Sequence, residues 1–161
     1  MATAKSPIPE GYHTVTPILT FEECSAALDW YARGLGAEIL SRSPGPDGRI
    51  MHSEFKIGDS KLMAHDTMMD GKGPKGFGGS PAALWIFVPD DDALFNRAIA
   101  AGATQIRPME DQFWGDRCGT FKDPHGFAWT IATRKEDLTR DELNQRAEAF
   151  FKQFAEGPGK K

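Results

Sequence analysis

The sequence predicts an α+β fold in which the element order β-α-β-β-β occurs twice in tandem and a separate helix follows. Apolar residues alternate as in strands and then recur at helical spacing, in the same order, in two stretches of similar length. A glycine-rich segment, residues 68–82, separates these stretches. The final residues, 139–161, carry only a helical pattern. We therefore expect one domain over residues 1–138, with module one at about 12–67 and module two at about 83–135.

Module one opens with "TVTPILTF" (residues 14–21), which alternates and is rich in β-branched residues, as strands are. The next stretch begins with acidic residues, has apolar residues at helical spacing and reaches Gly36, which is suited to end a helix. "AEILSRS" then predicts a strand, and the Asp-Gly in "PGPDGR" predicts the turn after it. "IMHSEFKI" and "SKLMAHD" complete the module as two strands joined at Gly58 and Asp59.

Module two repeats this order. "AALWIFVP" predicts a strand and "DDDALFNRAIAAG" a helix, with acidic residues at its start and Gly102 at its end. "ATQIRPM" predicts a strand, "EDQFWGD" a loop, and "RCGTFKD" and "FAWTIATR" two more strands. The turn between the last two strands contains Pro124 and Gly126, so we expect His125 to lie at an exposed hairpin tip.

The two modules align at one constant offset along the chain, the offset that places Ala27 on Ala93. Identical pairs fall in mid-helix, at the helix end and near the last hairpin: Ala27-Leu28 with Ala93-Leu94, Gly36-Ala37 with Gly102-Ala103, and Phe55-Lys56 with Phe121-Lys122. Their agreement in position favours a duplicated half-barrel. Two unrelated α+β stretches are the alternative reading.

The C-terminal segment predicts an amphipathic helix. Thr139 and Glu142 have the spacing of a capping box. The apolar residues after them share one helical face: Leu143, Ala147, Phe150, Phe151 and Phe154. We expect this helix to pack on the outside of the barrel or on a partner subunit.

Composition excludes several classes of protein. Hydrophobic residues make up 40% and charged residues 26% of the 161 residues, as in globular domains. The net charge of −4 argues against nucleic-acid binding, and no apolar run approaches the roughly 20 residues of a membrane span. Cys24 and Cys118 have no zinc-type spacing and no secretory signal is visible, so we expect a cytoplasmic protein. "GKGPKGFGG" lacks the register of a phosphate-binding loop.

The doubled pattern resembles the vicinal oxygen chelate superfamily, which includes glyoxalases, extradiol dioxygenases and bleomycin-resistance proteins. The likeness lies in "TPILTFEECSAALDWYARGLGAEIL" and "WGDRCGTFKDPHGFAWTIATRKEDL", and covers residues 12–138. The second stretch is similar to the PhnB-like glyoxalase-like branch, through Trp114–Arg117 and Asp123–Gly126. The resemblance implies an open barrel of the glyoxalase/bleomycin-resistance type, a small-molecule ligand and a homodimer.

Metal-dependent members of this superfamily place His or Glu ligands on the first and last strands of each module. The resemblance puts these four positions at Thr16, Ala64, Ala83 and Thr130. Alanine has no donor atom and a neutral hydroxyl is a poor one, so we expect no metal cofactor. A divalent metal held at a non-standard site is the alternative, and its candidate ligands are His13, His52, Glu54 and His65.

Side chains in register with these four positions predict an apolar, aromatic pocket between the modules. The predicted pocket residues are Thr16, Ile18, Ala64, Asp66, Trp85, Phe87, Phe113, Trp114, Arg117 and Thr130. Trp114 is suited to stack on a planar ligand, and Asp66 is the carboxylate to test as a general base. Arg117 is suited to pair with a ligand anion, or alternatively with Asp116 or Asp111. The alternative reading of the whole set is that it fills a core.

Three hypotheses for function follow. The first is a metal-independent protein that binds a small aromatic or amphipathic molecule, as bleomycin-resistance-like members do. The second is a metal-dependent lyase or dioxygenase with displaced ligands. The third is a non-catalytic interaction module that uses the C-terminal phenylalanine face.

Overall fold

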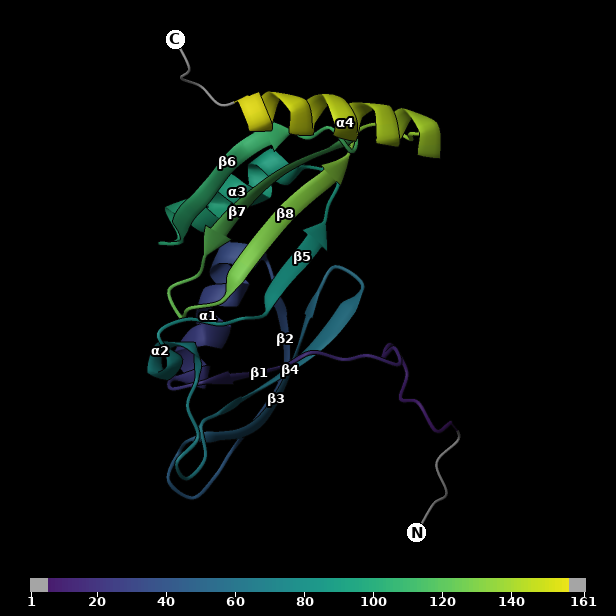
Figure 1. The fold of residues 1–161 in the computed structure, drawn as a ribbon. Coiled ribbons are helices and arrows are strands. Elements are labelled where there is room, and N and C mark those ends of the chain that lie inside the picture. Colours follow the sequence, from purple (N-terminus) through teal and green to yellow (C-terminus); the bar gives the residue numbers. More distant parts are fainter. Residues whose placement is uncertain (1–5, 157–161) are drawn as a thin grey trace.

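The structure is a computed structural model, and it describes residues 6–156 except for the side chains of residues 154 and 156. It contains the two modules in tandem (Figure 1). Module one comprises β1 (Ile18–Phe21), α1 (Cys24–Leu35), β2 (Glu38–Pro44), β3 (Ile50–Ile57) and β4 (Ser60–Asp66). Module two comprises β5 (Ala83–Phe87), α3 (Asp91–Ala100), β6 (Thr104–Asp111), β7 (Asp116–Lys122) and β8 (Ala128–Arg134). The linker holds α2 (Pro74–Phe77), and α4 (Arg140–Glu156) follows module two.

Each module forms its own four-stranded sheet, in the order β1-β4-β3-β2 and β5-β8-β7-β6. The pairs β1–β4 and β5–β8 are parallel, and the other pairs are antiparallel. The two sheets follow one another and do not close into a complete barrel (Figure 1). The α+β class and the tandem β-α-β-β-β architecture are confirmed.

The first strand is shorter than predicted, because pairing begins at Ile18 instead of Thr14. Pro17 has no amide hydrogen to donate, and only its carbonyl joins the ladder, by accepting from the Met63 amide at 2.9 Å. Residues 13–16 therefore run ahead of the sheet as an irregular segment.

The predicted constant offset between the modules does not hold for their last strands. Ser53 pairs with Ala64 in the first sheet, and Gly119, its counterpart at the predicted offset, pairs with Ile131, one position beyond that offset. The hairpins differ in length: residues 58–59 connect β3 to β4, whereas residues 123–127 connect β7 to β8. Because side chains alternate between the faces of a strand, a change of a single position moves each side chain to the opposite face.

The two modules share one core on the helix-bearing side of the sheets. The largest fully buried side chains are aromatic: Trp129, Tyr31, Phe21, Phe55 and Phe121. The Trp30 indole donates across the module boundary to the Ala101 carbonyl at 2.8 Å, and the Arg97 guanidinium donates to the Arg33 carbonyl at 2.7 Å. Burial of such large rings dominates the stability of a domain of this size.

The predicted exposure of His125 is wrong, because this residue is only 9% exposed. Its backbone amide donates to Asp123 at 2.8 Å, which turns the loop inward, and its ring packs edge-on against Phe21. The linker covers the same hairpin, since a Cβ atom on Gly126 would lie 2.7 Å from the side chain of Pro74. Burial lowers the pKa of the His125 imidazole.

Helix α4 lies across one end of the second sheet (Figure 1). The predicted capping box is present: the Thr139 amide donates to Glu142 at 2.8 Å, and the Glu142 amide donates back to Thr139 at 3.3 Å. The ring of Phe150 packs against Phe113 with centroids 4.9 Å apart, so the helix packs on its own module. The Phe154 side chain, part of the predicted face, lies outside the described residues. None of the described helices is long and apolar enough to cross a membrane.

Candidate functional site

A cavity of about 450 Å³ lies between edge strand β5 and the β3–β4 hairpin. Its walls come from both modules and from the N-terminal segment ahead of β1. The lining side chains and backbone atoms belong to His13, Val15, Pro17, Ile57, Gly58, Asp59, Ser60, Lys61, Leu62, Leu84, Trp85, Ile86, Phe87, Val88 and Trp129. Most of this lining is apolar, and the polar groups gather at the hairpin and the N-terminal segment. This combination is typical of a small-molecule site.

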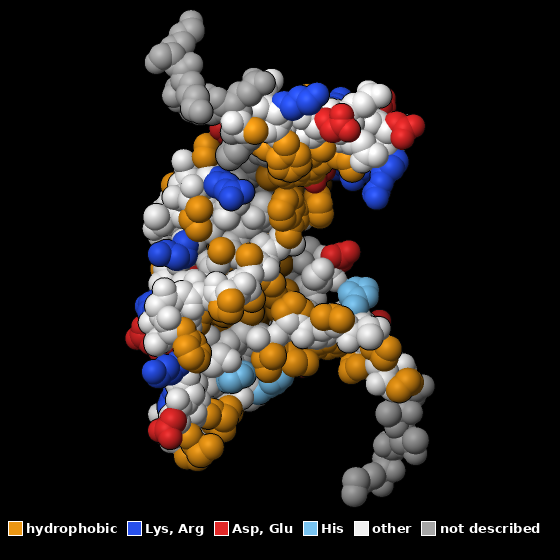
Figure 2. Space-filling view, viewed as in Figure 1, with side chains coloured by type: hydrophobic (Ala, Val, Ile, Leu, Met, Phe, Trp, Pro, Cys, Tyr) orange, Lys and Arg blue, Asp and Glu red, His pale blue; other side chains and the backbone are white. Residues whose placement is uncertain are grey.

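Besides the buried Trp129, the aromatic lining of the cavity comes from Trp85 and Phe87. Their exposed fractions are 47% and 61%, and their rings are 5.9 Å apart with a tilt of 40°. Leu84 and Ile86 alternate with them and point to the core. Hydrophobic side chains gather along the middle of the face shown in Figure 2, from α4 down to the first sheet. Sequence reasoning identified Trp85 and Phe87 as pocket residues, and the structure brings them together.

The other eight predicted pocket residues do not line this cavity, and two of them, Ile18 and Thr16, lie near the start of β1. Ile18 lines a smaller hollow of about 210 Å³ between β1 and the linker, together with Phe77 and Phe127. Thr16 sits in the N-terminal segment, where its hydroxyl donates to the His13 carbonyl at 3.4 Å.

The interpretation of Ala64 as an inward position needs correction. Ala64 is fully buried on the face that carries the helices, where the Ser53 hydroxyl donates to its carbonyl at 2.7 Å. Thr130 pairs with Trp85 and faces the opposite, open side, so Ala64 and Thr130 are not equivalent. The counterpart of Thr130 is Met63, the neighbour of Ala64, because the second hairpin is longer. The residue on the other side of Ala64, His65, also faces the open side.

The open-face positions on these strands therefore offer Met63, Ala83 and Thr130, and Thr16 lies in the irregular segment ahead of β1. A thioether and two neutral hydroxyls do not fit a divalent metal that needs imidazole or carboxylate donors. The Thr130 hydroxyl is already hydrogen-bonded to the Thr120 hydroxyl at 2.9 Å.

The four non-standard candidates are dispersed. His52 and Glu54 approach to 3.6 Å on β3. His65 is hydrogen-bonded through both ring nitrogens, to the Thr20 hydroxyl at 3.2 Å and to the Asp66 carbonyl at 2.8 Å. His13 lines the cavity wall. Within residues 6–156, no group of three or more His, Cys, Asp or Glu side chains is arranged to hold a metal ion.

Asp66 lies on the core side of the first sheet, away from the cavity. One carboxylate oxygen accepts from the Cys24 amide at 2.7 Å, and the other accepts from the Ile50 amide at 2.6 Å. Both contacts anchor backbone, one at the start of α1 and one at the start of β3. A carboxylate with both oxygens occupied in this way stabilises the fold and has no free oxygen directed to a ligand.

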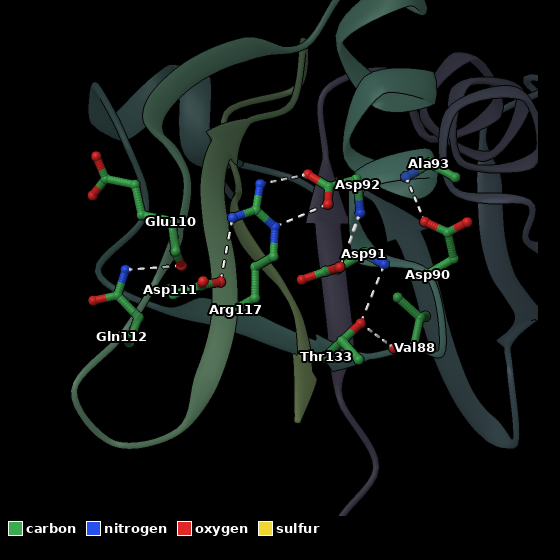
Figure 3. A network of polar contacts seen from close by, with 10 residues as sticks. All are labelled: Val88, Asp90, Asp91, Asp92, Ala93, Glu110, Asp111, Gln112, Arg117 and Thr133. Atoms are coloured by element: carbon green, nitrogen blue, oxygen red, sulfur yellow. Dashed lines mark hydrogen bonds and ion pairs between the residues drawn. The ribbon is translucent and has the colours of Figure 1, made fainter. Parts of the chain in front are cut away.

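Arg117 is held by carboxylates of module two (Figure 3). Its guanidinium donates to both oxygens of Asp92 at 2.9 Å and to Asp111 at 3.3 Å. The ion pair with Asp111 was one of the two readings from sequence, whereas the main partner, Asp92, was missed. The acidic run at the start of α3, which contains Asp92, was the feature of the sequence that could have indicated this partner. Hydrogen bonding to Arg117 lowers the pKa of Asp92.

Phe113 and Trp114 also lie away from the cavity. The Trp114 indole donates to the Asp116 carboxylate at 3.0 Å. Phe113 packs on Trp114 and on Phe150 of α4, with centroids 5.0 and 4.9 Å apart. These loop residues therefore fasten α4 to module two.

The paired β-α-β-β-β modules, the open sheets and the cavity between them define a protein of the glyoxalase fold. The sequence matches the model of the Glyoxalase/Bleomycin resistance protein/Dioxygenase superfamily over residues 13–131, and the chain belongs to this superfamily.

Among curated proteins, the chain is similar to an uncharacterized protein of Mycobacterium tuberculosis, Rv0887c. The two are 37% identical over 134 residues, which cover 80% of this chain and 79% of the relative. Protein YjdN of Escherichia coli is 26% identical over 147 residues, covering 78% of this chain and 99% of that protein. Among solved structures, TioX from Micromonospora sp. ML1 has a TM-score of 0.62 at 27% identity, covering 79% of this chain and 100% of TioX.

Proposed function

We propose that this protein binds a small aromatic or amphipathic molecule in the cavity between β5 and the β3–β4 hairpin. One observation carries the proposal: both modules line the cavity, and the half-exposed rings of Trp85 and Phe87 border it. Exposed aromatic rings bury a large area when a planar ligand stacks on them. The polar side chains of His13, Asp59 and Lys61 at one end suit a ligand with a polar group.

We further propose that binding needs no metal. Neither the four predicted ligand positions nor Met63 offers an imidazole or carboxylate, which supports sequestration as the mode of action, as in the bleomycin-resistance-like members that the chain resembles. The free cysteines Cys24 and Cys118 are both buried thiols, which fits our proposal of a reducing, cytoplasmic location.

A neutral dye, N-phenyl-1-naphthylamine, tests the proposed cavity. We expect its fluorescence to increase on binding to the wild type. The affinity for the dye should fall about tenfold or more in Trp85→Ala and in Phe87→Ala, because each variant loses a stacking ring. Ile106→Ala is a matched control, since Ile106 is an exposed apolar residue of the same sheet that does not line the cavity. Equal binding by all four proteins would refute this site.

The second candidate is a metal-dependent lyase or dioxygenase with displaced ligands. It is favoured by the approach of His52 to Glu54 and by the position of His65 on the same open face of the first sheet. Metal analysis of untagged protein, purified without chelator, separates the two candidates. Stoichiometric nickel, zinc, iron or manganese would replace the metal-free proposal with this one.

We also propose that the protein forms a homodimer through the open faces of its sheets. Large apolar side chains are half-exposed there, namely Ile18, Trp85, Phe87 and Ile106, with exposed fractions of 54%, 47%, 61% and 53%. Exposed apolar surface of this kind is typical of an association site. Light scattering coupled to size-exclusion chromatography measures the mass, and a monomer at micromolar concentration would contradict the proposal.

A further inference from the structure

The N-terminal segment, residues 9–17, forms one wall of the cavity and is fixed at its two ends. At one end the Pro17 carbonyl accepts from the Met63 amide at 2.9 Å. At the other end the Lys61 ammonium donates to the Glu10 carbonyl at 2.8 Å. His13 and Val15, between these ends, face the cavity.

Lys61 contacts three consecutive residues of this segment. Besides its bond to Glu10, the ammonium lies 4.8 Å from the centroid of the Tyr12 ring, within the range of a cation–π contact. It also packs closely on Gly11, where an added Cβ atom would lie 2.9 Å from the Lys61 Cε atom. One side chain from β4 therefore clasps residues 10–12.

Little else holds the middle of the segment. In the part of the chain that the structure describes, the hydrogen bond inside residues 13–16 joins Thr16 to His13, and none reaches a sheet. Val15 is 82% exposed, so burial contributes little. Segments with few buried contacts open at low free-energy cost.

We propose that Lys61 is a positioning residue of the cavity: by clasping residues 10–12, it holds the N-terminal wall against β4 and keeps the cavity closed on that side. This inference rests on the proposed ligand site and identifies what sets its geometry. Without the clasp, the attachments that remain are the Pro17 carbonyl and the interaction of the Tyr12 hydroxyl with Glu54 of β3, and the wall formed by His13 and Val15 is loosened.

Lys56 offers a matched control. It is the cross-strand partner of Lys61, and it differs in its contacts, since its ammonium pairs with Glu38 at 3.3 Å at the far side of the sheet. Lys61→Met and Lys56→Met therefore remove the same charge from neighbouring positions, and only the first removes the clasp.

The test has two measurements on the full-length protein. Chymotrypsin cleavage after Tyr12, relative to cleavage after the exposed Phe77, reports release of the segment. We expect this ratio to rise about fivefold or more in Lys61→Met and to stay unchanged in Lys56→Met, because local release exposes the chain to protease.

The second measurement is dye binding. Affinity for N-phenyl-1-naphthylamine should fall roughly five- to tenfold in Lys61→Met only. Lys61→Arg, which donates and stacks similarly, should retain most of the affinity. The dye is neutral, so loss of charge alone does not explain a change.

An unchanged cleavage ratio in Lys61→Met would overturn the clasp, and faster cleavage with unchanged dye affinity would overturn its role in the cavity. Should Lys61→Met fail to fold, Gly11→Ala disturbs the same contact from the other side, at a positive φ of 75°. If the wild type fails to bind the dye, the ligand site itself is refuted. The cleavage ratio still decides whether Lys61 holds the segment.

Discussion

The Tyr31 hydroxyl of module one donates to the Asp123 carboxylate of module two at 2.8 Å, and both residues are almost completely buried. The same carboxylate accepts from the Trp129 indole at 2.8 Å and from the backbone amides of His125 and Phe127 at 2.8 and 3.1 Å. Asp123 thus shapes the β7–β8 turn and joins it to α1. Burial, followed by the neighbouring Asp123 charge, raises the pKa of Tyr31, which therefore stays protonated as the donor.

Asp123→Asn should destabilise the fold strongly. An amide has a single acceptor oxygen, so at least one of the buried donors around position 123 loses its partner, at a cost of about 2–4 kcal/mol. Urea unfolding monitored by tryptophan fluorescence measures this loss. Asp59→Asn, at the exposed tip of the hairpin in module one, is the control and should change stability by less than about 0.5 kcal/mol. Equal stability of the two variants would contradict the role of Asp123.

His125 should make the stability depend on pH. Its pKa is lowered in the folded protein, so the unfolded state binds more protons once the pH falls below the ordinary histidine value of about 6.5. The contribution is therefore complete above this value and is lost progressively as the pH falls towards the folded pKa. The groups that act on the ring are Asp123, Lys75, Glu23 and Glu22.

The measurement compares unfolding free energies of the wild type and His125→Phe between pH 5 and pH 7.5. The wild type should lose stability relative to the variant as the pH falls through this range, because the phenylalanine takes up no proton. His52→Phe, a change at a more exposed histidine, serves as the control. Parallel pH curves for wild type and His125→Phe would show that the buried imidazole does not titrate in this window.

Arg117→Met should weaken the fold slightly and in a salt-dependent way. The Asp92 side chain is 49% exposed and that of Arg117 26% exposed, so solvent screens the pair and we expect a loss of only about 0.5–1 kcal/mol at low salt. The pKa of Asp92 is lowered, so this contribution is present above the unfolded value of about 3.9 and disappears as the pH falls below it. Unfolding at low salt and at about 1 M NaCl, where the Debye length is near 3 Å, measures the effect. Arg107→Met, at an exposed position on neighbouring β6, is the control, and a salt-independent loss at Arg117 would point to packing instead.

Removing residues 139–161 should leave dye binding within about twofold of the wild type, since none of the residues that the structure describes in this segment lines the cavity. The thermal midpoint should fall, because the truncated protein exposes Phe113 and loses the Arg146–Glu136 ion pair at 2.6 Å. Size-exclusion chromatography with light scattering reports the mass of the truncated protein. A smaller assembly with unchanged dye binding would assign α4 to subunit contacts, and lost dye binding would contradict the separation of α4 from the cavity.

The element order was predictable because it depends on local patterns. Alternation identified the strands, helical spacing identified α1 and α3, and the spacing of Thr139 and Glu142 identified the cap of α4. The aromatic positions Trp85 and Phe87 followed from the same alternation on β5. The start of β1 was misplaced because a proline at position 17 ends the ladder, although its neighbours have high strand propensity.

By itself, the sequence determined the tandem α+β modules and their superfamily. It also determined that the four predicted ligand positions, Thr16, Ala64, Ala83 and Thr130, carry no imidazole or carboxylate. Only the tertiary structure decided which side of each sheet a residue faces. The longer β7–β8 hairpin moves the alignment of the last strands by a single position, so that Thr130 corresponds to Met63. Ala64 itself lies in the core beside Leu19, and Met63 and His65 lie on the open side. The tertiary structure also decided the surroundings of three further residues, because their partners are distant in sequence. Asp66 contacts Cys24, Arg117 contacts Asp92, and His125 contacts Phe21. Burial and hydrogen bonding depend on such long-range contacts, which no local pattern encodes.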